Sequence, residues 1–116
     1  MSETPSNWNR APVPVNDARI TSVGVLALDR RRVDVAVDIT RCSVPLTVEM
    51  VIVGPDDDEL CSILLMDNRE WALDKVMHLR EDAGAGEHIL HVGIFHENGL
   101  VDRAAQSFRF PEVEAG

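Results

Sequence analysis

Residues 33–40 have the sequence VDVAVDIT, in which β-branched residues and mostly polar ones alternate at every position. Alternate residues of an extended chain point to opposite sides, so one side of this segment is apolar and the other suits water. The apolar set is Val33, Val35, Val37 and Ile39, and the other set is Asp34, Ala36, Asp38 and Thr40. The pattern predicts a strand that covers a hydrophobic core with one face.

Six more short apolar segments flank this strand, and turn residues separate them. They cover 19–28, 46–53, 60–66, 69–80, 88–96 and a final segment that ends at Phe110 before Pro111. The pair Asn98-Gly99 is a strong hairpin signal, so the last two strands should be antiparallel neighbours. Seven short strands without a convincing long helix predict an all-β fold, a seven-strand antiparallel sandwich, with a barrel as the alternative.

Segment 69–80 also fits a helix. Asp67 followed by Glu70 resembles a capping box, and Trp71, Leu73 and Val76 could share a helical face. The alternating pattern fits slightly better, because Trp71, Leu73 and Met77 then lie on one side with Lys75 as the exception. We therefore predict a strand.

The two ends of the chain differ in composition from the middle. Residues 1–17 hold three of the six prolines and several small polar residues, which favours a flexible tail. Residues 112–116 form a second tail, and residues 18–111 form the domain. The N-terminal segment lacks the basic start and apolar stretch of a secretory signal, which predicts a cytoplasmic protein.

The charge of the chain argues against several classes of partner. With 20 acidic residues against 11 Lys and Arg, the net charge is −9, which repels nucleic acid and anionic membrane surfaces. No apolar run approaches the roughly 20 residues that cross a bilayer. The one basic cluster, Arg30–Arg32, lies beside Asp29 and Asp34, and we interpret it as a turn of solvated charges.

Motifs for catalysis or cofactor binding are missing from the sequence. It has no Gly-x-Ser-x-Gly elbow, no glycine-rich phosphate loop and no His-Glu-x-x-His zinc motif, so we expect neither an enzyme nor a cofactor. Cys42 and Cys61 do not form a zinc-type pair, and we expect reduced thiols over a disulfide.

Two metal sites were considered. His88, His91 and His96 lie on one predicted strand, where His88 and His96 would be roughly 26 Å apart and His91 would face the opposite side, so they cannot bind one ion. The acidic run Asp56, Asp57, Asp58 and Glu59 offers oxygen ligands for calcium but lacks the spacing and glycine of an EF-hand loop. A small-ligand or calcium-binding module is therefore the alternative function.

The stretch 79–92, LREDAGAGEHILHV, resembles the corner between the fifth and sixth strands of immunoglobulin-like and fibronectin-type-III-like domains. His88 stands where that corner has tyrosine, so its hydrogen bond would come from imidazole or be absent. The sixth predicted strand lacks the cysteine of antibody-type domains, and the third lacks their tryptophan. The resemblance implies an immunoglobulin-like sandwich with the first, second and fifth strands in one sheet and the other four in the second, and it implies no activity.

The strands of the predicted second sheet are apolar on both sides. If Val48, Met50, Ile52, Leu64, Leu90, Val92 and Ile94 fill the core, an apolar set faces outward. This set is Val51, Val53, Ile63, Leu65, Ile89 and Phe95. Such a face is typical of a binding surface, so we expect a non-catalytic module that binds a protein partner or itself. Alternatively, the tail with Trp8, Val13 and Val15 covers this face, or a bulge changes the assignment.

Overall fold

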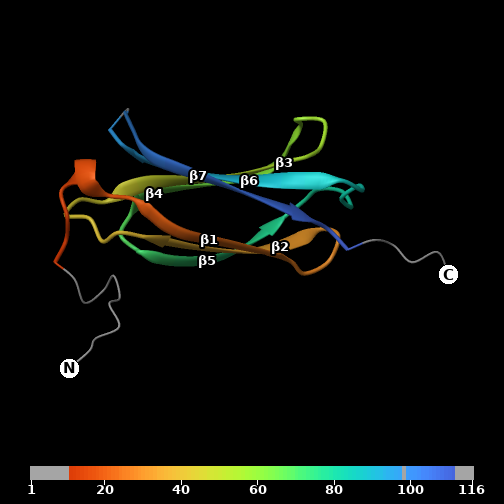
Figure 1. The fold of residues 1–116 in the computed structure, drawn as a ribbon, viewed down its shortest axis with the longest axis horizontal. Helices are drawn as coiled ribbons and strands as arrows, with labels where there is room; N and C mark the ends of the chain where they lie inside the picture. Colours follow the sequence, from red (N-terminus) through yellow and green to blue (C-terminus); the bar gives the residue numbers. More distant parts are fainter. Residues whose placement is uncertain (1–10, 98, 112–116) are drawn as a thin grey trace, which may run out of the picture.

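The computed structural model describes residues 11–97 and 99–111, and within them seven strands form two antiparallel sheets that face each other (Figure 1). The three-stranded sheet has the order β1 (Ile20–Ala27), β2 (Arg32–Ile39), β5 (Ala72–His78). The four-stranded sheet has the order β4 (Glu59–Asn68), β3 (Leu46–Val53), β6 (Glu87–His96), β7 (Gly99–Arg109). A short 3-10 helix, η2 (Val15–Asp17), precedes β1.

The predicted fold class is confirmed: the protein is an all-β, seven-strand antiparallel sandwich, and its strand order is the one that the resemblance implies. The ambiguous segment forms a strand, β5, although it begins at Ala72 and not at Arg69. β6 and β7 are antiparallel neighbours as expected. His96 pairs with Gly99 and Glu97 has a φ of 55°, so the tight turn starts one residue earlier than the Asn-Gly pair.

The core lies between the two sheets and is built from the alternate residues of each strand. The apolar set of β2, from Val33 to Ile39, has no exposed surface. It faces the inner side chains of the four-stranded sheet, which include Met50, Ile52 and Leu90. Burying each such side chain contributes about 1.5–3 kcal/mol, which favours this register over any one-residue slip.

The outside of the three-stranded sheet has the polar character that the sequence predicts. The even residues of β2 lie next to those of β5, and Ala36 pairs with Asp74. Asp34 and Asp74 share a hydrogen bond, which raises the pKa of Asp34 above its ordinary value, with burial and the charge of Asp74 as further causes. Two neighbouring carboxyl groups suit a surface in contact with water.

Residues 11–17, which we expected in the flexible tail, pack on the sandwich. Val13 forms a parallel bridge with Cys42, because its N–H donates to the Arg41 carbonyl and its own carbonyl accepts from Ser43. Val13 and Val15 also pack against the core. Residues 1–10, with Trp8, and residues 112–116 lie outside the described residues. Val13 and Val15 therefore extend the core instead of covering a sheet face.

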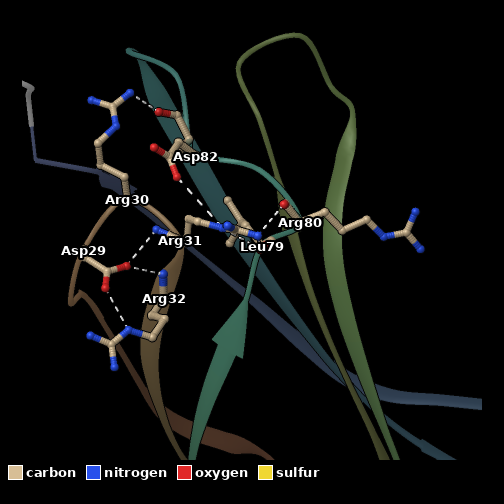
Figure 2. A network of polar contacts seen from close by, with 8 residues as sticks. Asp29, Arg30, Arg31, Arg32, Leu79, Arg80 and Asp82 are labelled. Atoms are coloured by element: carbon tan, nitrogen blue, oxygen red, sulfur yellow. Dashed lines mark hydrogen bonds and ion pairs between the residues drawn. The ribbon is translucent and has the colours of Figure 1, made fainter.

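The turn between β1 and β2 is held by one carboxylate (Figure 2). Asp29 Oδ1 accepts from the backbone N–H groups of Arg31 and Arg32, each at 2.8 Å. Its Oδ2 accepts from Arg32 Nε at 2.7 Å. These hydrogen bonds, that of the Arg31 N–H first, lower the pKa of Asp29 below its ordinary value.

The same turn binds the corner that follows β5. Leu79 N–H donates to the Arg31 carbonyl and Ala83 N–H to the Arg30 carbonyl, both at 2.7 Å. The guanidinium groups donate hydrogen bonds in the opposite direction. That of Arg30 donates to the Ala83 carbonyl, and that of Arg31 donates to the Leu79 and Arg80 carbonyls (Figure 2). The arginines that we expected to be solvated thus satisfy backbone acceptors of the corner.

His88 replaces the corner tyrosine in both packing and hydrogen bonding. It is 1% exposed, and its ring lies 4.9 Å from that of Phe110 and 5.8 Å from that of Phe108, centroid to centroid. Its Nδ1 lies 3.1 Å from the Gly86 carbonyl oxygen. Because a carbonyl only accepts, Nδ1 carries the proton and donates. The corner hydrogen bond therefore comes from imidazole.

We predict that His88→Ala lowers the free energy of unfolding by about 3 kcal/mol, because it leaves a cavity between two phenylalanine rings. His88→Phe keeps a ring in place and removes the donor to Gly86, so it should cost about 1 kcal/mol. Urea denaturation of both variants measures the difference. Equal losses would show that the hydrogen bond and not the ring packing dominates at this position.

A second prediction concerns acid. Because the folded-state pKa of Asp29 is lowered, its contribution to stability is present above the ordinary carboxyl pKa and is lost as the pH falls through the lowered value. Asp29→Ala should therefore be less stable than the natural protein at neutral pH, and the gap should close in acid. Thermal unfolding between pH 7 and pH 2 tests this, with Asp17→Ala as the control. A gap that is constant with pH would contradict it.

Candidate functional site

The candidate site is the outer face of the four-stranded sheet, the side that points away from the core. Cross-strand pairing places its members in rows: Glu49 lies between Leu64 and Gly93, and Val51 lies between Ser62 and His91. The outer face comprises Glu49, Val51, Val53, Ser62, Leu64, Met66, Ile89, His91, Gly93, Phe95, Leu100, Arg103 and Ala105. It therefore mixes apolar and polar residues.

Four of the six predicted interface residues lie on the outer face, all half-buried: Val51, Val53, Ile89 and Phe95. The prediction was wrong for Ile63 and Leu65. Ile63 pairs with Met50 and Leu65 with Val48, and since cross-strand partners share a face, both point inward and pack against the core. Leu64, which we expected in the core, points outward instead and is 58% exposed.

Three exposed side chains of the outer face were missed by the sequence reasoning. Met66 is 71% exposed and Leu100 52%, and with Leu64 they are the most exposed large apolar side chains of this sheet within the described ranges. Leu64 and Met66 project from β4, which lies at one edge of the sheet. The one available signal was Ser62, a polar residue in the even set of β4, which points to the even set as the outward one.

A hollow lies on the outer face above Gly93. It has a volume of about 670 Å³ and is lined by residues including Glu49, His91, Phe95 and Arg103. The Phe95 ring lies over Gly93, where an added Cβ would come within 2.9 Å of it. Glu49 and Arg103 stand on either side of Gly93 in one cross-strand row. The hollow thus offers an aromatic ring between opposite charges.

The acidic run lies in the loop between β3 and β4. Asp56, Asp57 and Asp58 are exposed, and Glu59 begins β4. The loop is a tight turn, in which Gly54 N–H donates to the Asp58 carbonyl at 2.9 Å and Asp57 has a φ of 65°. Over the described residues, no three His, Cys, Asp or Glu side chains converge as metal ligands. The structure therefore adds nothing to the calcium alternative.

Both cysteines are free thiols. Cys42 is buried, and Cys61 points inward from β4, where it pairs with Ile52. Burial, with the charge of Glu59 as a smaller cause, raises the pKa of Cys61 to about 11. No helix among the described residues is long and apolar enough to cross a membrane.

No protein-family description and no curated protein sequence matches the chain. Solved structures do resemble its fold. A Bifidobacterium dentium β-glucuronidase, in complex with coumarin-3-O-glucuronide, has a TM-score of 0.61 at 13% identity, covering 86% of this chain and 19% of the enzyme. A β-glucuronidase from glycoside hydrolase family 2 has a TM-score of 0.59 at 11% identity, covering 80% of this chain and 12% of that one.

A third structure, a glycosyl hydrolase family 2 member from Bacteroides cellulosilyticus, has a TM-score of 0.53 at 10% identity and covers 80% of this chain and 15% of its own. This chain thus spans less than a fifth of the enzymes that it resembles. At such identities the likeness concerns the fold.

These neighbours correct the expectation that the protein has no enzymatic role. The sequence predicts no enzyme because it lacks catalytic motifs, yet these three similar structures are those of glycoside hydrolases. The inference failed because a sandwich of this size is a small part of each of these hydrolase chains. A lack of catalytic motifs in the sandwich therefore does not show whether the sandwich serves an enzyme.

The raised pKa of Cys61 leads to a prediction about the reactivity of its thiol. Its pKa of about 11, against an ordinary 9.0, leaves about one hundredth of the usual thiolate at neutral pH, and the thiolate is the reactive form. In a Cys42→Ala background, alkylation by iodoacetamide at neutral pH should be about tenfold or more slower than that of an exposed thiol, because the higher nucleophilicity of this thiolate offsets part of its smaller fraction, and the rate should rise with pH beyond 10. A rate that levels off near pH 9 would contradict the inward orientation of Cys61.

Proposed function

We propose that this protein is an interaction module that docks onto another protein through the outer face, and that its partner is a glycoside hydrolase. We also place it in the immunoglobulin-like superfamily. The strand order supports that placement, and so does the likeness to the sandwich-containing hydrolases. The module would then contribute to an enzyme as an accessory part, and the hydrolase partner would hold the catalytic residues.

The observation that carries the docking proposal is the exposure of Leu64, Met66 and Leu100 on one sheet face. Exposed apolar side chains that gather on one surface are typical of protein-protein contacts. The outside of the three-stranded sheet also exposes Leu26 and Val76, but both flank Asp34, and its carboxylates make it the less suitable docking surface. Glu49, His91 and Arg103 would supply polar contacts around the apolar ones.

The choice of a hydrolase rests on the comparisons. In the β-glucuronidases the matching region occupies 12 to 19% of the chain, so the sandwich there is a minor part of a larger enzyme. We propose that a module with the same fold likewise forms a minor part of a hydrolase assembly by packing on the enzyme. A second copy is the less favoured partner, because each copy carries a net charge of −9.

The test uses sedimentation velocity of the protein alone and mixed with a family 2 glycoside hydrolase from the same organism. We expect a complex, and we expect the double variant Leu64→Glu/Met66→Glu to weaken it about tenfold or more. Leu26→Glu is the matched control, since Leu26 is 62% exposed on the other sheet. It should leave the affinity unchanged.

Three results would contradict parts of this proposal. A complex that both variants weaken equally would move the contact away from the outer face. Dimerisation of the protein alone, abolished by the double variant, would replace the hydrolase by a second copy. Absence of any complex and any dimer would remove the docking function.

A further inference from the structure

The free edge of β4 is the side of residues 60–66 that faces away from β3. β4 is the terminal strand of its sheet, and within the described part of the chain no strand pairs with this side. Residues 60–66 have the sequence LCSILLM, without charge or proline. Natural proteins often place charged residues or proline on edge strands. These residues keep the unpaired backbone N–H and C=O groups of the edge from binding another strand.

The other terminal strands differ from β4 in this respect. β5 carries Asp74 and Lys75, and β7 carries Asp102 and Arg103. β1 is uncharged, but β7 packs beside it, and its Ile20 N–H donates to Asp102 Oδ2 at 2.9 Å. Among the described residues, the run 60–66 of β4 therefore combines an unpaired strand side with an uncharged sequence, while the charges of β4, Glu59 and Asp67, lie at its two ends.

We infer that the free edge of β4 binds an extended peptide segment of a partner as an added strand, and that this segment is basic at one end and uncharged in its middle. The inference rests on the proposed function and names the element that the partner contributes. The added strand would lie next to β4, where Leu64 and Met66 contact its side chains on the outer face. Backbone hydrogen bonds would supply the rest of the affinity.

Charge complementarity favours basic residues at the one end of the segment that would lie beside residues 56–59. Asp56–Glu59 leads into β4, and a hollow of about 330 Å³ beside it is lined by Asp58, Glu59, Glu81 and Asp82, with Arg80 as the one basic residue. Lysine or arginine at the matching end of a bound strand would meet this acidic surface. An acidic segment would be repelled.

A second copy of the chain fits the edge less well. Antiparallel pairing of two β4 strands would bring residues 67–69 of one copy to Asp56–Glu59 of the other. In that segment the charges of Asp67 and Arg69 cancel, so it offers no net positive charge. Each copy also carries −9 in total, which opposes the pairing.

The first test uses a synthetic peptide of alternating valine and threonine with two lysines at each end, titrated into the full-length protein by calorimetry. Two further peptides carry backbone N-methyl groups on one or the other alternate set of residues. Because a strand pairs along one of its edges, one methylated peptide should lose at least about tenfold in affinity and the other should bind as before. Equal binding of the two would overturn strand addition.

The second test concerns charge. A peptide with glutamates in place of the lysines should bind at least about tenfold more weakly. Asp58→Lys/Glu59→Lys should weaken binding of the lysine peptide about fivefold. The control variant Asp74→Lys introduces a lysine on the outside of the other sheet and should leave it unchanged. Equal effects of the variant and its control would overturn the choice of a basic segment.

These outcomes are separable from those of the docking test. If Leu64→Glu/Met66→Glu loses the hydrolase complex but no peptide binds the protein, docking through the outer face is supported. Strand addition at the free edge of β4 is then overturned. Peptide binding without a hydrolase complex would support the edge and overturn the hydrolase partner. Self-association that the lysine peptide cannot displace would assign the edge to a second copy and overturn the inference.

Discussion

The contact between the inner side of β2 and the inner side of the opposite sheet is the interaction on which the rest of the structure depends. β2 is the central strand of its sheet and pairs with β1 and β5, so its position sets theirs. Its four inward side chains, from Val33 to Ile39, are fully buried. A shift of one residue would expose this row and bury Asp34 and Asp38, which the hydrophobic effect and charge desolvation both oppose.

The sequence predicts the fold well where one face is polar and poorly where both are apolar. In β2 the aspartates mark the outer side, and the structure agrees. In β4 the run 60–66 is apolar except for Ser62, and one small polar residue is a weak basis for choosing a face by period two. A register shift beside Ile52 and Val53 also turns Leu60 toward the core together with Cys61. Such bulges depend on the neighbouring strand, which explains why Ile63 and Leu65 were placed on the wrong side.

The candidate surface was predictable in outline only. That the outside of the four-stranded sheet would carry apolar residues followed from the sequence, and Val51 and Phe95 lie there. The hollow did not follow, because it needs Glu49, Gly93 and Arg103 to align across three strands, and alignment is a property of register. The arginines of the β1–β2 turn were likewise interpreted without the corner that they bind.

The irregular ends of β4 limit what its open edge can recruit. Pairing with β3 shifts register near Leu46 and again near Val53, so the regular part of β4 is short, and Asp67 has a φ of 51° just beyond it. An uncharged run of seven residues is long enough for fibril stacking, but bulges twist an edge strand and so oppose repeated strand addition. An edge that is regular for only a few residues can accept one short strand and then stops. The bulges at both ends of β4 thus act against the open-ended pairing that its uncharged run would otherwise favour.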